Sequence, residues 1–166
     1  MRAYFIALSV VLGAILPSLA VPQGLVTQRN LSLPMAKTIA EAALAACKEK
    51  GFNTAVAVVD RAGQVMVILR DEQATAQQVE MARRKAYTAR MFRTSTLEFQ
   101  KRTSDPAYAP QRELPDILAL GGGVPIQIGN GVGADVIGGV GSSGANQDND
   151  DACAKAGVAK VAELLK

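Results

Sequence analysis

Residues 54–70 read TAVAVVDRAGQVMVILR, and this stretch decides what kind of sheet the chain can form. Its first part, Thr54–Val59, is dense in β-branched residues, and Gln64–Arg70 has the same character. The intervening Asp60–Gly63 supplies residues that are typical of tight turns. Two such runs separated by a short turn predict a β-hairpin.

A helix is expected on the N-terminal side of this hairpin. Ser32 can cap it, Pro34 falls in its first turn, and the alanine-rich stretch 35–50 forms its body. Gly51 then supplies a stop signal. This part of the chain therefore predicts one helix that leads directly into the hairpin.

Helical patterns also follow the hairpin. Thr75 can cap a helix over about 76–92, in which small residues recur on one face at helical spacing. A shorter helix is expected over 95–102. The stretch 105–110 contains two prolines and predicts an ordered loop.

The final third of the chain is rich in glycine and predicts a second hairpin followed by a helix. The strands are expected over 126–128 and 135–140, and the helix over 147–165. The complete order is helix, hairpin, helices, hairpin and helix. It favours an α+β domain, in which helices cover an antiparallel sheet, over a series of βαβ units.

The N-terminus predicts export from the cytoplasm. Arg2 precedes an apolar run over 3–16, and small residues follow at 18–20, where a signal peptidase cuts. The alternative is a membrane anchor, but the run is shorter than the roughly 20 apolar residues that span a bilayer. We therefore expect a periplasmic or secreted protein with no membrane span after cleavage. The expected organisation is a signal peptide over 1–20, a flexible leader over 21–30 and one domain over 31–166.

Composition excludes several classes of function. With 18 basic and 15 acidic residues, the chain has a net charge of only +3. No basic stripe concentrates this charge, which argues against nucleic acid as a partner. The chain has no histidine, so it has no Ser-His-Asp or Cys-His site and lacks the commonest metal-ligating side chain. No catalytic residue and no set of metal ligands is identified.

The two cysteines leave two alternatives open. Cys47 and Cys153 fall in the first and last expected helices. In an oxidising compartment they could form a disulfide if those helices are neighbours. Otherwise they are two separate buried thiols, which pack as small apolar side chains.

The glycine-rich motifs carry the candidate ligand contacts. Gly129–Ala134 matches a dinucleotide-binding pattern, but a strand follows it, so we interpret it as a hairpin turn. Gly122 and Gly123 could let a flat ligand approach the backbone, or could mark a bulge or a crossing of chains. Ser142 and Ser143 precede the last helix, where backbone N–H groups could hold a carboxylate or phosphate; a tight turn is the alternative.

The acidic residues at the start of the last helix have a simpler interpretation. Asp148, Asp150 and Asp151 fall in its first turn. Carboxylates there are favoured by the helix dipole.

A set of motifs, in this order along the chain, resembles the GlcG/HbpS family of haem-binding proteins. The resemblance covers about 31–166. The segments that carry it are Val58–Gly63, Arg84–Ala89, Gly122–Ile126, Ile137–Gly144, Gln147–Asp148 and Cys153–Gly157.

This resemblance implies a profilin-like, three-layer α/β/α fold with a five-stranded antiparallel sheet. It also implies haem as the ligand, with cobalamin as a less favoured tetrapyrrole, and self-association into a homo-oligomer. Exported members act as haem binders that can relay redox signals to a sensor partner. The resemblance favours a binding protein over an enzyme.

The absence of histidine bears on how such a protein would hold haem iron. An axial ligand could come from Tyr87, Tyr108 or Met91, or from a water held by Thr88 or Thr94. Tyr87 and Met91 could equally be core residues. Haem could also bind through its propionates, to one of the cationic side chains Arg83, Lys85, Arg93 and Arg102.

Two other functions remain open from the sequence. The first is an enzyme that acts on a small organic acid, held by the glycine-rich turn, with acid–base chemistry from Asp60, Glu80 or Lys85. The second is a ligand-free oligomeric module that binds a sensor protein.

Overall fold

The computed structural model describes residues 24–131 and 133–166. The expected signal peptide, 1–20, lies outside these residues, as does the start of the expected leader, 21–23. Residues 24–32 form neither helix nor strand. In the described part of the chain, no helix has both the length and the apolar character needed to cross a membrane.

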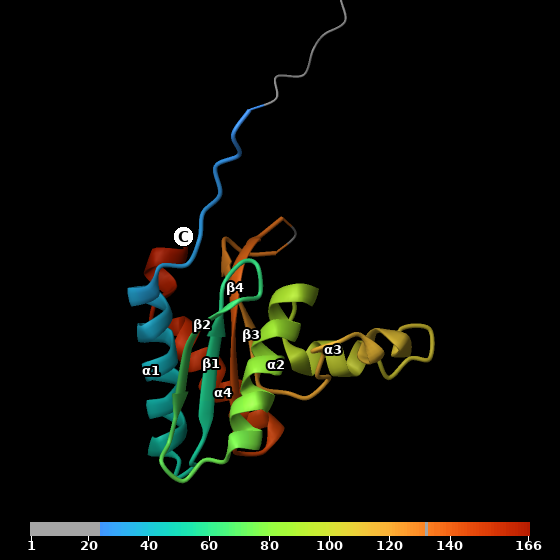
Figure 1. The fold of residues 1–166 in the computed structure, drawn as a ribbon. Coiled ribbons are helices and arrows are strands. Elements are labelled where there is room, and N and C mark those ends of the chain that lie inside the picture. Colours follow the sequence, from blue (N-terminus) through green and yellow to red (C-terminus); the bar gives the residue numbers. More distant parts are fainter. Residues whose placement is uncertain (1–23, 132) are drawn as a thin grey trace, which may run out of the picture.

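The elements follow the order expected from the sequence, and Figure 1 shows their arrangement. They are α1 (Leu33–Glu49), β1 (Ala55–Val59), β2 (Val65–Arg70), α2 (Ala76–Phe92), α3 (Thr96–Arg102), β3 (Gly123–Ile128), β4 (Asp135–Ser143) and α4 (Gln147–Ala159), with 3-10 helices at Ala109–Glu113 and Ala162–Leu165.

The strands form one antiparallel sheet in the order β2-β1-β4-β3. Helices α1 and α4 pack on one face, and α2 packs on the other (Figure 1). The α+β class and the antiparallel sheet are therefore confirmed. The family resemblance implied five strands, whereas the residues that the structure describes form four.

Strand β1 lies in the middle of the sheet and all its residues are buried. Val56 and Val58 face α1 and belong to the larger core cluster. Ala57 and Val59 alternate with them and face α2, where they pack against Ala86. This two-sided burial explains why the strand is continuously apolar.

Both expected N-caps are present. Ser32 Oγ accepts a hydrogen bond from the Met35 N–H at 3.3 Å, which starts α1. Thr75 and Gln78 form a reciprocal capping box at the start of α2. Each cap satisfies N–H groups that have no partner within the helix.

Glycines in the sheet allow α2 to lie unusually close to it. A Cβ atom on Gly141 would stand 2.1 Å from the carbonyl oxygen of Ala82. A Cβ on Gly139 would stand 2.3 Å from the carbonyl oxygen of Ala86. The glycine-rich segment is therefore a strand in contact with a helix backbone, and β4 extends through Ser143 rather than ending at residue 140.

The last helix is shorter than the sequence predicts. It ends at Ala159, and the chain continues as the 3-10 helix Ala162–Leu165. This break turns the chain so that Val161 and Leu165 are buried in the core that α1 shares with the sheet. The periodicity of the sequence did not reveal this change of direction.

An arm formed by α3 and the following loop projects from the body of the domain (Figure 1). Its base is held by Phe92 and Phe99, whose ring centroids are 4.3 Å apart. The Arg102 guanidinium lies over both rings, at 5.7 and 5.4 Å from their centroids. The expected ordered loop at 105–110 leads into the 3-10 helix at Ala109–Glu113.

Candidate functional site

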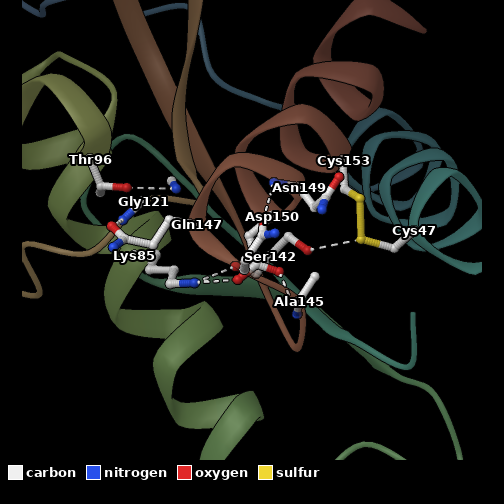
Figure 2. Close-up of polar contacts among 12 residues, drawn as sticks. Cys47, Lys85, Thr96, Gly121, Ser142, Ala145, Gln147, Asn149, Asp150 and Cys153 are labelled. Atoms are coloured by element: carbon white, nitrogen blue, oxygen red, sulfur yellow. Dashed lines mark hydrogen bonds and ion pairs between the residues drawn. A yellow bond between two sulfur atoms is a disulfide. The ribbon is translucent and has the colours of Figure 1, made fainter. Parts of the chain in front are cut away.

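Lys85 lies in the middle of α2 with a relative exposure of only 1%. Its Nζ donates a hydrogen bond of 2.8 Å to Oδ2 of Asp150 in α4, and another of 2.9 Å to the carbonyl oxygen of Ser142 in β4. Figure 2 shows the ammonium group directed toward these two residues. We call Lys85, Ser142 and Asp150 the buried ion-pair cluster. Because a buried charge must be paired and hydrogen-bonded, the cluster links three elements that are distant in sequence.

Burial shifts both ionisable groups of this cluster toward their neutral forms. It lowers the pKa of the Lys85 ammonium, and the charge of Asp150 opposes that shift. It raises the pKa of the Asp150 carboxyl, and Lys85 and two backbone N–H groups oppose that shift. Each charge is thus tolerated because the other is present.

The Asp150 carboxylate lies in the turn before α4, where the sequence predicted that backbone N–H groups could bind an external anion. Its Oδ1 accepts a hydrogen bond of 3.1 Å from the Ala145 N–H, and the Gly144 N–H also binds this carboxylate. The turn before α4 therefore binds a carboxylate, but one that belongs to the chain itself. Sequence reasoning assigned Asp150 only to the helix dipole, and the signal it missed was a lysine on the packed face of α2 that needed a partner.

Gly122 and Gly123 close this cluster from the β3 side. A Cβ on Gly122 would stand 2.6 Å from the Ser142 carbonyl oxygen and 2.9 Å from Nζ of Lys85. The Gly123 N–H donates to the Thr96 hydroxyl at 2.8 Å. Of the sequence alternatives, the structure therefore shows a close crossing of chains at these glycines.

The cysteines lie beside the same cluster. Cys47 in α1 and Cys153 in α4 form a disulfide, with their Cα atoms 5.4 Å apart. The Cys47 Sγ lies 3.6 Å from the Ser142 Oγ (Figure 2). The pairing that the sequence left open is thus present, and the disulfide joins the first and last α-helices next to the ion pair.

Thr88 and Arg93, both candidates for ligand contact, are engaged within the chain. The Thr88 hydroxyl is buried, donates to the Arg84 carbonyl at 2.8 Å and accepts from the Leu118 N–H at 2.9 Å. Nη2 of Arg93 donates to the Ala134 carbonyl at 2.7 Å. Thr88 therefore fixes the loop that crosses α2, and Arg93 fixes the approach to β4.

Tyr87 and Met91 lie on a different side of α2 and are half-buried. Both contact the turn between β1 and β2, because a Cβ on Gly63 would meet the Met91 Cε at 2.5 Å and the Tyr87 ring at 2.8 Å. Val65 and Ile68 of β2 pair with residues that face α2, yet they are 44% and 41% exposed because α2 packs mainly on the other three strands. We call Val65, Ile68, Tyr87 and Met91 the α2–β2 flank.

Comparison with known proteins places this geometry in a family. A family model described as "Haem degrading protein HbpS-like" matches residues 31–159. The chain belongs to the HbpS-like haem-degrading protein family. Among curated proteins, none matches this member of the family significantly.

Three crystal structures share the fold of this HbpS-like chain. A double mutant of HbpS from Streptomyces reticuli is 34% identical, with a TM-score of 0.75, and the match covers 89% of this chain and 97% of that one. A PduOC–haem complex is 25% identical, with a TM-score of 0.68 and coverages of 80% and 95%. Klebsiella pneumoniae protein ORFY, of family DUF336, is 23% identical, with a TM-score of 0.75 and coverages of 85% and 97%, which shows the shared fold.

The remaining candidate residues of this family member are spread over the surface. Arg83 binds the carboxylates of Glu80 and Asp116 at 2.7 and 2.6 Å, which together raise its pKa. Tyr108 is 46% exposed on the arm, and Thr94 is half-buried between α2 and α3. Arg83, Tyr108 and Thr94 belong neither to the buried ion-pair cluster nor to the α2–β2 flank.

The structure does not gather the acid–base candidates into one site. Asp60 Oδ1 accepts hydrogen bonds from the Ala62 and Gln64 N–H groups at 2.9 and 2.8 Å, and so stabilises its own turn. Glu80 is exposed and paired with Arg83, whereas Lys85 is enclosed with Asp150. The described residues also contain no group of three or more acidic or cysteine side chains that could hold a metal ion.

Proposed function

We propose that this chain is an exported haem-binding protein that captures haem or senses redox state through it. The observation that carries the proposal is membership of the HbpS-like haem-degrading family. The similarity to PduOC, whose crystal structure is a haem complex, supports haem as the ligand. Cobalamin remains the less favoured tetrapyrrole, because the PduOC structure is a complex with haem.

The α2–β2 flank has the residue types that a haem surface needs. Val65 and Ile68 provide exposed apolar side chains for a flat macrocycle. Tyr87 and Met91 add a phenol oxygen and a thioether sulfur, which are both known axial ligands of haem iron. When bound, haem would supply redox chemistry at its iron, while these four side chains would bind and orient it.

The buried ion-pair cluster fits haem poorly. Lys85, Ser142 and Ser143 are at most 2% exposed. The Lys85 ammonium and the N–H groups beside Asp150 already have partners. A ligand could reach them only after the sheet and α2 had separated, so we assign this cluster a structural role.

The proposed export and self-association have separate support. The Cys47–Cys153 disulfide fits an oxidising compartment, because cytosolic proteins are kept reduced. Strands β2 and β3 are both at edges of the sheet, and exposed edges are surfaces on which copies of a chain can pair. Native mass spectrometry of protein purified from its host would report oligomer size and bound ligand together.

Titration with haemin tests the haem proposal. We expect the protein to shift and sharpen the Soret band of haemin. Tyr87→Phe and Met91→Leu should each alter the spectrum of the complex or weaken binding, because each removes one donor atom at nearly constant volume. Tyr108→Phe on the arm is the matched control and should behave as wild type. A spectrum that stays identical to that of free haemin would refute the proposal.

A further inference from the structure

A pocket of about 610 Å³ lies at the end of the sheet where β1 turns into β2. The leader approaches α1 at the same end of the sheet (Figure 1). We call this the Arg90 pocket. Its lining consists of Gln28, Asn30, Leu31, Asp60, Arg61, Ala62, Met66 and Arg90.

Arg90 is the unusual member of this lining. The structure gives its guanidinium no hydrogen bond or ion pair with any described residue, and Nε is enclosed without a partner. A guanidinium carries five N–H donors in a rigid fork, and burying such donors unpaired is costly. Burial lowers the Arg90 pKa, the neighbouring charges of Arg61 and Arg93 lower it further, and the carboxylates of Asp135 and Asp60 oppose this shift. A further anion beside the guanidinium would therefore be stabilising.

The two neighbouring arginines are already engaged. Arg61 binds both carboxylate oxygens of Asp135 at 2.8 Å and also donates to the Arg29 carbonyl. Arg93 donates to the Ala134 carbonyl. Asp135 is therefore occupied by Arg61. Asp60, the other acidic side chain near Arg90, accepts hydrogen bonds through Oδ1 from the Ala62 and Gln64 N–H groups. Of the three guanidinium groups, Arg90 is the one whose fork remains available to a ligand.

The base of the Arg90 side chain packs against the backbone of β4. A Cβ on Gly139 would stand 3.2 Å from the Arg90 Cβ, so the side chain starts in close contact with β4. It then reaches the turn that Asp60 stabilises through the Ala62 and Gln64 N–H groups. The pocket therefore places the guanidinium beside an ordered turn, where one ligand could contact both.

We propose that the Arg90 pocket is a carboxylate-binding site, in which the Arg90 fork binds the carboxylate of a small organic ligand. The fork matches a carboxylate bidentately. Leu31, Ala62 and Met66 would contact the apolar part of the ligand, while Asn30 offers an amide. The volume lies in the range of sites for small organic molecules.

Two sources offer such a carboxylate: a free organic acid, and a propionate group of haem. The first is independent of the proposed haem function, and the second rests on it. The test therefore uses four probes: 3-phenylpropanoate, its uncharged amide, haemin, and the dimethyl ester of haemin, which lacks free propionates.

Calorimetry with the full mature chain compares wild type with Arg90→Gln, Arg90→Lys and Arg112→Gln. Wild type should bind 3-phenylpropanoate but not its amide, and Arg90→Gln should weaken binding at least about tenfold, as expected for loss of a charge-assisted hydrogen-bond pair. Arg90→Lys keeps the charge but lacks the planar fork, so its affinity for 3-phenylpropanoate should lie between those of wild type and Arg90→Gln. Arg112→Gln removes a guanidinium outside the pocket and should match wild type. Circular dichroism verifies that each variant is folded.

The measurements with haemin and its dimethyl ester then distinguish the two sources of the carboxylate. If the carboxylate is a propionate, Arg90→Gln and esterification should each weaken haemin binding, and 3-phenylpropanoate should compete with haemin. If it is a free acid, haemin binding should be unchanged by Arg90→Gln while 3-phenylpropanoate binding is lost. The proposal is overturned if wild type binds no 3-phenylpropanoate and its haemin affinity equals that of Arg90→Gln. If haemin nevertheless binds in that outcome, the proposed haem function stands without the Arg90 site. If the protein binds 3-phenylpropanoate but not haemin, the Arg90 site stands without the haem function.

Discussion

Lys85 and Arg90 are two cations on the same helix, five residues apart, and the structure treats them in opposite ways. Lys85 is almost fully buried and binds Asp150 and the Ser142 carbonyl. Arg90 lines an open pocket and has no partner among the described residues. The difference teaches that a cation on the packed side of a helix is not by itself evidence of a ligand site; what matters is whether the chain already supplies its anion.

The two surroundings explain the two outcomes. Near Lys85, glycines at 122 and 123 let backbone close over the side chain, and the turn before α4 delivers Asp150. Near Arg90, the carboxylate of Asp135 is bound by Arg61, and Oδ1 of Asp60 accepts hydrogen bonds from two backbone N–H groups. The ion pair of Lys85 is complete within the chain, whereas Arg90 has no ion-pair partner among the described residues.

The largest expected effect comes from breaking the complete region. Asp150→Ala leaves Lys85 as an unpaired buried cation and should lower the free energy of unfolding by about 3–5 kcal/mol. Denaturant unfolding measures the change. Asp148→Ala, at an exposed position in the same turn, should change stability by no more than about 0.5 kcal/mol. Equal effects of the two variants would contradict the role given to the ion pair.

Loss of the disulfide beside that region should have the next largest effect. Cys47→Ala combined with Cys153→Ala should lower the free energy of unfolding by about 2–4 kcal/mol, chiefly because the unfolded chain becomes less constrained. Reduction of wild type with dithiothreitol should reproduce this loss and leave the double variant unchanged. If treatment with dithiothreitol leaves the stability of wild type unchanged, the result would argue against a stabilising disulfide. Carboxylate binding at Arg90 should persist in the folded double variant.

Removing the unpaired cation should have the opposite sign. Arg90→Gln relieves the burial of the guanidinium and its repulsion from Arg61 and Arg93, which together outweigh the lost attraction to Asp135 and Asp60. The ligand-free protein should therefore become more stable by about 0.5–1 kcal/mol, as residues kept for function often cost stability. Thermal unfolding without ligand measures this gain. A clear loss of stability would mean that Arg90 has a structural partner.

The smallest effect is a pH dependence at the neighbouring pair. The Arg61 guanidinium lowers the pKa of Asp135 below its usual value. A lowered carboxyl pKa stabilises the fold above the ordinary pKa near 3.8, and that contribution is lost as the pH falls through the folded-state value. Asp135→Asn should therefore cost stability at pH 7 and cost less at pH 3, as judged from urea midpoints. Equal losses of stability at pH 7 and pH 3 would contradict this expectation.

The sequence predicted most of the fold because its local signals were strong. Ser32, Thr75 and the turn at Asp60–Gly63 mark their elements through side-chain hydrogen bonds to nearby backbone, so a short window contains the information. The glycines of β4 were harder. A glycine in a turn and a glycine under a helix look the same in a sequence, and only the packing of α2 tells them apart.

The site was predicted less well, for a related reason. Ser142 and Ser143 were predicted to precede a turn that could bind an external carboxylate. The carboxylate bound there is Asp150, which also pairs with Lys85 from a distant part of the sequence. Arg90 was not chosen at all. Its interest depends on which neighbouring anions are already occupied, and no pattern along a single chain records that.

The Cys47–Cys153 disulfide also changes the covalent connectivity of the chain. Those residues are 106 positions apart, so the bond closes a covalent ring that contains the whole sheet, α2 and the projecting arm. A protease that cuts once within this ring, for example near the exposed Tyr108, opens a loop without separating the protein into two molecules. The nicked chain would migrate as one species on a non-reducing gel and as two after reduction. For the exported protein that we propose, a single cut in the projecting arm would therefore leave the domain in one piece.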